Sequence, residues 1–468
     1  MRRTVVAIVC GAVALVGVAG YVVADVHDMV PGVLTDAQGA TAADPPKIAA
    51  QSLSSPQIQS GWTGTDASNQ DSSTPVDAAS VQALWADVQK AAEDGKYQAW
   101  ATVVDATTNQ VLLDAQSQQA FTPASVTKTL TARVALEDLS ATKRLATGTS
   151  LNADTLYLWG EGDLLLASGQ SDPDAISGHA GVATLAQNTA AALKNQGVTS
   201  VTLNWQDALF EGAAHLAEWD AQGNGTFAGQ VGPFAMDAGR TYADAYEFVA
   251  DPPRLVADQL AEDLRSQGIN VTLGEASEAP SQSTPLAQVE SATVEQQIRW
   301  MLWHSDNTLA EQYCHLAAKK AGLSTTYESS AAHVADSLKK LGVPTTGLDL
   351  HDCSGLSEND RIAGVTLVEN FRSAMTSDKP QVRDLVRSLP WAGVNGTLDS
   401  RLNEGNAVAN VQAKTGSLGQ VSSLAGVVTT KSGRMLIFAM GTDQVPDNAA
   451  WGTRTVLDAA VEGLASLP

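Results

Sequence analysis

The periodic apolar pattern that predicts folded structure begins near residue 80. In the segment SVQALWADVQKAAEDG, residues 80–95, apolar side chains recur at helical spacing, which predicts an amphipathic helix. The next segment, YQAWATVVDATTNQVLLDAQ, has two short apolar runs on either side of the polar residues 107–110. This arrangement predicts a β-hairpin. A second helical pattern then begins near Pro123.

Residues 147–288 show a different pattern. Short strand-like runs such as TLYLWGEGDLLL and VTSVTLNWQDALF are broken by Gly and Asp. Two helical patterns, GVATLAQNTAAALKNQG and PPRLVADQLAEDLRSQG, each end in Gly before a β-branched run, which is typical of α/β units. No catalytic constellation stands out here, so we expect residues 147–288 to form an inserted module.

The last part of the chain, residues 289–468, opens with the long helical pattern VEQQIRWMLWHSDNTLAEQYCHLAAKKAG, interrupted near Ser305. Two apolar runs, SSLAGVVTT and MLIFAMGT, then flank a turn at 431–434, and an amphipathic helix follows. A hairpin near each end with helices between them predicts an α/β (α+β) fold. Residues 80–146 and 289–468 would build one antiparallel sheet with helices packed on it.

The first 32 residues predict export. Two arginines precede an uncharged apolar run from Thr4 to Val23, which is long enough for a retained membrane anchor, although it also fits a cleaved signal peptide. In either case the positive residues stay inside, which places the protein in the cell envelope, on the outer face of the cytoplasmic membrane or secreted. Residues 33–79 are rich in Ala, Ser, Thr, Gln and Asp and predict a disordered linker.

Charge and cysteine content limit the possible partners. A formal net charge of −23 argues against nucleic acid, which needs clustered Lys and Arg. Of the three cysteines, only Cys314 and Cys353 belong to the exported part, and one disulfide or two buried thiols would fit equally well. The histidines are scattered, and the metal-binding spacings CxxC and HExxH are missing from the sequence. We therefore expect neither a metal nor another cofactor.

Candidate chemistry appears first in the segment PASVTKTL. Ser125 and Lys128 are three positions apart, so on a helix they share a face. A serine hydroxyl becomes a nucleophile when a base takes its proton, and a lysine can do this if burial lowers its pKa. A helix start would also present N–H groups to an anionic intermediate. Alone, however, the spacing fits a helix-start serine and a solvated lysine.

Two further motifs follow, Ser305-Asp306-Asn307 and Lys414-Thr415-Gly416. Ser305 offers a second hydroxyl for a proton relay, and Asn307 an amide to hold either the substrate or the first lysine. Lys414 offers a fixed positive charge, and Gly416 lets a substrate backbone approach closely. Each motif alone could be a helix cap or a turn. In this order, S-x-x-K, S-D-N and K-T-G form the signature of class A β-lactamases and penicillin-binding proteins.

The residues around these motifs make the likeness more specific. The chain from about residue 80 onward resembles the D-alanyl-D-alanine carboxypeptidase/endopeptidases of the class C, low-molecular-mass penicillin-binding proteins. The similar segments are PASVTKTLTA (123–132), SDNTLAE (305–311), DCSGLS (352–357) and AGVNGTLDSRL (392–402). The resemblance implies a serine β-lactamase-like transpeptidase domain with an insertion between the first and second motifs. Cys353 departs from the family, which has glycine there.

The resemblance also implies a mechanism and partners. Ser125 would attack the carbonyl between two D-alanines of a peptidoglycan stem peptide while Lys128 takes its proton, and Ser305 would help to protonate the leaving D-alanine. The N–H groups of Ser125 and Ser417 would hold the oxyanion, and water would release the product. Penicillins and other β-lactams would acylate the same serine. The terminal carboxylate would be held by Lys414, Thr415 and Ser417.

Four alternatives stay open. A class A β-lactamase needs a deacylating glutamate in an ExxxN spacing, whereas Glu358-Asn359 and Glu369-Asn370 are adjacent pairs, which disfavours that class. A transpeptidase differs only in the acyl acceptor. A non-enzymatic peptidoglycan-binding module would not need an intact set of Ser and Lys residues. A structural linker protein is supported only by the long polar segment.

Overall fold

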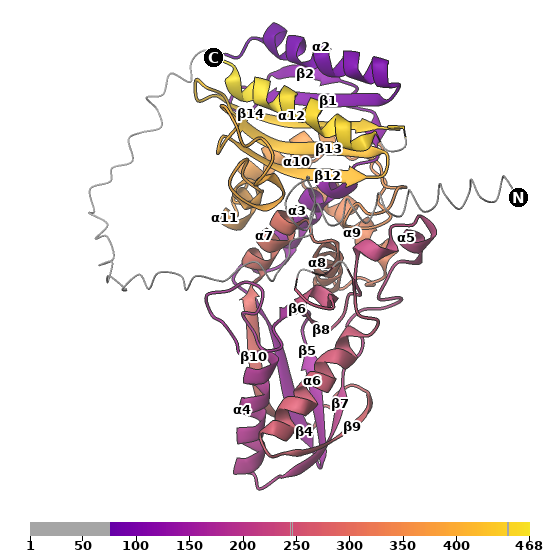
Figure 1. Ribbon diagram of the computed structural model, residues 1–468, viewed down its shortest axis with the longest axis vertical. Helices are drawn as coiled ribbons and strands as arrows, with labels where there is room; N and C mark the ends of the chain where they lie inside the picture. Colours follow the sequence, from indigo (N-terminus) through magenta and orange to yellow (C-terminus); the bar gives the residue numbers. More distant parts are fainter. Residues whose placement is uncertain (1–74, 244, 246, 447–448) are drawn as a thin grey trace, which may run out of the picture. The chain divides into compact units, whose positions relative to one another are not determined.

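The computed structural model describes residues 75–468, apart from 244, 246, 447 and 448 (Figure 1). The expected leader or anchor at 1–32 lies outside the described residues, as does the expected linker up to residue 74. In the described part of the chain, no helix is both long enough and apolar enough to cross a membrane.

The first helix, α2 (Ala78–Gly95), confirms the helix predicted from periodicity. It begins at Ala78 because the Asp77 carboxylate accepts hydrogen bonds from the backbone N–H groups of Ala79 and Ser80, as is typical of an N-cap. Val76 is already buried. The packed structure therefore begins slightly before the expected boundary at residue 80.

One five-stranded antiparallel sheet joins the two ends of the described chain (Figure 1). Strand β1 pairs with β14 along its whole length, from Gln98 opposite Asp443 to Asp105 opposite Leu436. Both predicted hairpins are confirmed, as is the single sheet built from both ends. In spatial order the strands are β12 (Val411–Leu418), β13 (Val421–Thr429), β14 (Met435–Asp443), β1 (Gln98–Asp105) and β2 (Val111–Ala115).

This sheet separates two apolar cores. Ala101 and Val103 pack with residues of α2 and α12 (Ala450–Ser466), whereas Trp100 and Val104 pack with the helices of the middle of the chain. Successive side chains of a strand point to opposite faces. Because both faces are covered, β1 is buried from Ala99 onward.

The helical middle of the chain contains the predicted long helix and its interruption. Its parts are α7 (Val294–His304) and α8 (Asn307–Lys320), and the break at Ser305 is confirmed. Ser305 ends α7 with a left-handed φ of 54°, and the Asp306 carboxylate caps α8. The other helices here are α3 (Lys128–Asp138), α9 (Tyr327–Lys340), α10 (Gly364–Met375) and the short α11 (Pro380–Arg383).

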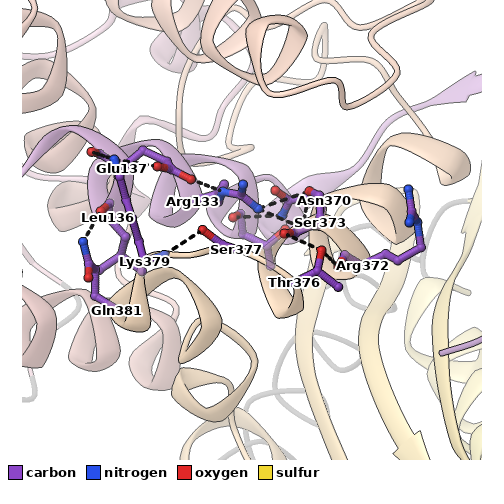
Figure 2. A network of polar contacts seen from close by, with 11 residues as sticks. Arg133, Leu136, Glu137, Asn370, Arg372, Ser373, Thr376, Ser377, Lys379 and Gln381 are labelled. Atoms are coloured by element: carbon purple, nitrogen blue, oxygen red, sulfur yellow. Dashed lines mark hydrogen bonds and ion pairs between the residues drawn. The ribbon is translucent and has the colours of Figure 1, made fainter. Parts of the chain in front are cut away.

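A polar network around the buried Arg133 joins α3 to α10 (Figure 2). The Arg133 guanidinium contacts Glu137 at 3.0 Å and donates to Ser373 Oγ at 3.2 Å. Lys379 also pairs with Glu137, at 2.8 Å. An unpaired buried charge would be costly, so the bond from Arg133 to Ser373 of α10 helps to specify how α3 packs. This bond helps to hold in place the helix that begins at Lys128.

A second five-stranded sheet is built from the segment between α3 and α7 (Figure 1). Its strands in spatial order are β10 (Thr284–Thr293), β4 (Arg144–Asn152), β5 (Thr155–Gly160), β7 (Ser200–Trp205) and β9 (Asn270–Ala276). Strands β5, β7 and β9 are parallel. Helices α4 (Val182–Asn195) and α6 (Pro252–Ser266) share a core with this sheet, so the two predicted α/β units are present.

Shorter elements complete the fold. Two small pairs of strands join segments that are distant in sequence, and a single-turn helix precedes residue 225. These elements are β3 (Ala120–Phe121) with β11 (Ile362–Ala363), β6 (Asp163–Leu166) with β8 (Phe234–Met236), and α5 (Ala217–Ala221). Strands β6 and β8 contribute side chains both to the core of the helical middle and to that of the second sheet.

Candidate active site

The first motif forms a tight turn instead of the first turn of an α-helix. Residues Ala124–Thr127 are a 3₁₀ turn, and α3 begins only at Lys128. Ala124 has a φ of 52°, a conformation that non-glycine residues seldom adopt without support from their surroundings. Part of that support is the Thr127 hydroxyl, which donates to the Ala124 carbonyl at 2.9 Å. The turn brings Ser125 to the start of α3 without making it helical.

Lys128 is fully buried beside Ser125. Its Nζ donates to Ser125 Oγ at 2.9 Å and to Asn307 Oδ1 at 2.6 Å. A third hydrogen bond goes to the Ser354 carbonyl at 2.7 Å. Burial lowers the pKa of Lys128 from 10.5 to about 8, although nearby carboxylates, Asp352 foremost, oppose the shift. Part of the lysine population is therefore neutral near physiological pH and able to accept a proton.

The second and third motifs meet at another lysine. Lys414 Nζ donates to Ser305 Oγ at 2.8 Å and to the Thr415 carbonyl at 2.8 Å. Burial lowers the pKa of Lys414 well below its ordinary value, and the positive charges of Lys128 and Arg401 act in the same direction. The sequence predicted a fixed positive charge here, and desolvation disfavours that form. A lysine with a lowered pKa can exchange a proton with Ser305.

The third motif lies on β12, at one edge of the main sheet. In the described part of the chain β12 pairs with β13 on one side, and near its start it is bridged to Trp391 through Gln412. The edge from Lys414 to Leu418 can therefore bind an extended peptide. Thr415 Oγ1 donates to Thr397 Oγ1 at 2.9 Å, and Ser417 Oγ donates to the Gly416 carbonyl at 2.7 Å.

Gly416 is needed by the protein's own packing. A Cβ at this position would lie 2.1 Å from Ser423 Oγ and 2.8 Å from the Pro123 carbonyl. The K-T-G motif predicts that this glycine lets a substrate backbone approach closely, which stays a prediction. The glycine also lets β12 lie directly against the turn that carries Ser125.

A loop outside the three motifs, residues 352–357, holds Lys128 in place. The Asp352 carboxylate accepts hydrogen bonds from the N–H groups of Gly355 at 2.6 Å and Ser357 at 2.7 Å. A third comes from Trp219 Nε1 at 2.8 Å. These bonds fix the loop whose Ser354 carbonyl contacts Lys128. The segment DCSGLS was the available signal, but its spacing alone does not reveal this contact.

The two open alternatives for the cysteines are decided by this loop. Cys314 of α8 and Cys353 form a disulfide with Cα atoms 6.2 Å apart, and both residues are buried. The bond ties the helix of the second motif to the loop that contacts Lys128. The cysteine that departs from the family pattern thus has a structural partner.

The structure brings the predicted residues into two groups, each joined by its own hydrogen bonds. Ser125, Lys128 and Asn307 form one, and Ser305, Lys414 and Thr415 the other. A polar cavity of about 790 Å³ opens beyond Ser417 at the end of β12. Among the residues that line this cavity are Phe121, Thr122, Arg361, Leu418 and Gln420.

Comparisons with known proteins show the family to which the chain belongs. The profile of the D-Ala-D-Ala carboxypeptidase 3 (S13) family matches residues 84–247 and 247–463. Carboxypeptidase DacB of Mycolicibacterium smegmatis is 32% identical over 378 residues, which cover 78% of this chain and 79% of that protein. Carboxypeptidase Rv3627c of Mycobacterium tuberculosis is 30% identical over 76% of this chain and 78% of that protein.

The fold is that of a solved penicillin-binding protein. The crystal structure of penicillin binding protein 4 (dacB) from Haemophilus influenzae has a TM-score of 0.63 and 20% identity, and covers 82% of this chain and 98% of that one. A structure of the same protein complexed with a β-lactam has a TM-score of 0.61. The predicted fold class is thus confirmed. The chain belongs to the D-Ala-D-Ala carboxypeptidase 3 (S13) family, and it is a D-Ala-D-Ala carboxypeptidase with a penicillin-binding fold.

Proposed function

We propose that this carboxypeptidase acts on peptidoglycan stem peptides through an acyl-enzyme on Ser125. The observation that carries the proposal is the 2.9 Å contact between Ser125 Oγ and the buried Lys128 Nζ. The pKa of Lys128, lowered to about 8, suits a general base that operates near neutral pH.

Acylation begins when Ser125 Oγ attacks the carbonyl carbon between the two terminal D-alanines. The hydroxyl proton passes to neutral Lys128 Nζ as the new C–O bond forms. The N–H groups of Ser125 and Ser417 donate to the oxyanion, a form of stabilisation that acts mainly in the transition state. Asn307 and Ser354 keep the lysine aimed at the nucleophile, because they fix two of its three hydrogen bonds.

Collapse of the tetrahedral intermediate breaks the C–N bond. The leaving D-alanine amine takes a proton from Ser305 Oγ, and Lys414, which contacts that oxygen at 2.8 Å, replaces it. Before deacylation, Lys128 passes the proton that it took from Ser125 to Lys414 through solvent, which returns both lysines to their starting states. Water then attacks the ester carbonyl while neutral Lys128 accepts one of its protons. Lys128 gives this proton to Ser125 Oγ as the ester C–O bond breaks, which releases the shortened peptide and restores Ser125.

Substrate binding uses β12 and its surroundings. Lys414, Thr415 and Ser417 hold the terminal carboxylate, and the stem peptide pairs with the edge of β12. The cavity beyond Ser417 accommodates the more distant part of the stem peptide. β-Lactams acylate Ser125 at the same place, and endopeptidase action on cross-links requires the same attack on a longer substrate.

The protein works in the cell envelope. The two arginines and the following apolar run up to Val23 support export, with the N-terminal segment either cleaved or retained as a membrane anchor. The disulfide between Cys314 and Cys353 fits an oxidising compartment.

The test is release of D-alanine from an N-acylated peptide that ends in D-Ala-D-Ala. We expect activity from the wild type and from Ser140→Ala, which changes an exposed serine, and none from Ser125→Ala. D-Alanine release by Ser125→Ala at the wild-type rate would overturn the proposed mechanism. Digestion of cross-linked and uncross-linked muropeptides, followed by mass analysis, then separates endopeptidase from carboxypeptidase action, and an amine acceptor reveals any transpeptidation.

A further inference from the structure

The second motif is held by residues of the segment 147–288, for which the sequence suggested no role. The Phe227 carbonyl accepts a hydrogen bond from Asn307 Nδ2 at 2.8 Å. The Gly229 N–H donates to Thr308 Oγ1 at 2.8 Å. Asn307 thus uses one end of its amide for Lys128 and the other for this segment.

Arg240 belongs to the same segment and pairs with the central residue of the motif. Its Nη2 lies 2.8 Å from Asp306 Oδ2, and the Asp306 side chain is only 3% exposed. The other carboxylate oxygen, Oδ1, accepts the Leu309 N–H at 2.9 Å as the cap of α8. Arg240 is itself oriented by a hydrogen bond to the Ala245 carbonyl at 3.2 Å and by stacking 4.8 Å from the Phe248 ring centroid.

The position of Asp306 gives this ion pair its importance. Asp306 lies between Ser305 and Asn307, each of which contacts a buried lysine. Ser305 adopts the left-handed conformation, which requires support from neighbouring contacts. A shift of the Asp306 carboxylate would therefore displace both flanking side chains at once.

The pair also affects the charge around the base. The negative charge of Asp306 raises the pKa of Lys128, against the larger effect of burial. Arg240 offsets part of that negative charge. The charged and titratable groups that act on Lys128 or respond to it are Asp352, Glu311, Asp306, Asp360 and Lys414.

We propose that Arg240 is a positioning residue for the carboxypeptidase reaction, which through its ion pair with Asp306 holds Ser305 and Asn307 against the two lysines. This inference rests on the proposed function of Ser125 and Lys128. It gives the segment 147–288 a part in catalysis without placing any of its side chains on the reacting atoms.

The test compares Arg240→Met with Arg254→Met, which removes a half-exposed arginine of the same segment that pairs with Asp258. We measure kcat and KM for a D-Ala-D-Ala peptide, and the rate of acylation by a fluorescent penicillin, from pH 6 to 10. For Arg240→Met we expect kcat and the acylation rate to fall by about 10-fold to 100-fold, because misplaced groups impair the chemical step, with KM changed less. Arg254→Met should stay within about 2-fold of wild type, as expected for a surface pair.

The pH profile separates positioning from simple loss of stability. Without Arg240 the Asp306 charge favours protonated Lys128, so the acidic limb of the Arg240→Met profile should move to higher pH by about 0.5 to 1 unit. Arg240→Lys restores a positive charge and should recover part of the rate. Arg240→Met combined with Asp306→Asn removes both charges and should return the limb toward its wild-type position.

A wild-type profile and rate for Arg240→Met would overturn the inference, as would an equal loss in Arg254→Met. If Arg240→Met shows no cooperative thermal transition, Arg240→Gln is tested in the same way. A shift of its acidic limb to higher pH would support the inference, and a limb at the wild-type position would overturn it. If Ser125→Ala loses activity while Arg240→Met keeps the wild-type rate and pH profile, this inference is rejected and the proposed function stands. Activity in Ser125→Ala would reject the proposed function itself.

Discussion

The carbonyl oxygen of Ser354 accepts a hydrogen bond from Lys128 Nζ at 2.7 Å, although 226 positions separate the two residues. The loop that contains Ser354 is fixed from two sides. The Asp352 carboxylate accepts hydrogen bonds from backbone N–H groups of the loop, and the disulfide at Cys353 joins the loop to α8. The direction of the base is therefore set by a part of the chain that carries no catalytic motif.

Lys128 should control the pH dependence of acylation. Because the neutral amine is the active form, and its pKa is about 8, the acylation rate should rise from pH 6 and level off above about pH 8. Lys128→Ala should lose about 100-fold to 10,000-fold in rate, the contribution typical of a general base. Lys128→Arg should be equally slow at every pH tested, because arginine stays charged.

These rates can be measured with a fluorescent penicillin between pH 6 and 10. An acidic limb that persists unchanged in Lys128→Ala would show that another group takes the serine proton.

Removal of the disulfide should affect both stability and activity. The bond closes a loop between residues 39 positions apart, which corresponds to about 4 kcal/mol of stabilisation by the chain-entropy model. Cys314→Ala combined with Cys353→Ala should lower the free energy of unfolding by an amount of that order and slow acylation, because Ser354 is less firmly held. Urea unfolding and penicillin labelling test the two effects. An unchanged free energy of unfolding and an unchanged acylation rate would contradict the role of the disulfide in holding this loop.

Lys414 should matter most for substrates with a poor leaving group and a free carboxylate. Lys414→Ala should reduce kcat/KM by about 100-fold on a D-Ala-D-Ala peptide, within the range expected for loss of a proton relay. A thioester substrate, whose leaving group needs no proton, should be affected less. Lys340→Ala, which changes an exposed lysine, is the control. Equal losses on the peptide and the thioester would contradict proton transfer through Ser305.

Gly416→Ala should separate β12 from the turn of the first motif. The added Cβ would meet Ser423 Oγ at 2.1 Å and the Pro123 carbonyl at 2.8 Å, and such overpacking costs about 1–3 kcal/mol. Gly419→Ala is a matched control close to the same strand, since no atom lies within 4 Å of its Cβ. The midpoint temperature of thermal unfolding and the rate of acylation should both fall for Gly416→Ala, whereas Gly419→Ala should change neither. Similar values for the two variants would contradict the packing argument.

The sequence predicted the elements whose signals are local. Neighbouring residues determine each of these elements, so the sequence was sufficient to predict them. They are the helix near residues 80–95, the two hairpins and the break at Ser305. The three motifs indicated the site because their order is specific, even though each one alone is ambiguous. The carboxypeptidase activity was implied by the family resemblance that these residues carry, and the comparisons confirm it.

Other features depend on contacts that no local pattern shows. The 3₁₀ turn at Ser125 is supported by the packing of β12 and Gly416 against it. The lowered pKa of Lys414 arises from burial and from the charge of Lys128, and neither influence is visible in the K-T-G motif. The fixed positive charge expected at Lys414 stays a prediction. The ion pair between Arg240 and Asp306 joins two segments whose proximity only the tertiary structure reveals.

Mass spectrometry of the intact protein after exposure to penicillin shows whether Ser125 forms the acyl-enzyme. We expect a mass increase of one penicillin molecule, mapped by proteolysis to the peptide that contains Ser125 and missing from Ser125→Ala. An adduct on a different residue of the wild type, or an equal adduct on folded Ser125→Ala, would contradict this role of Ser125.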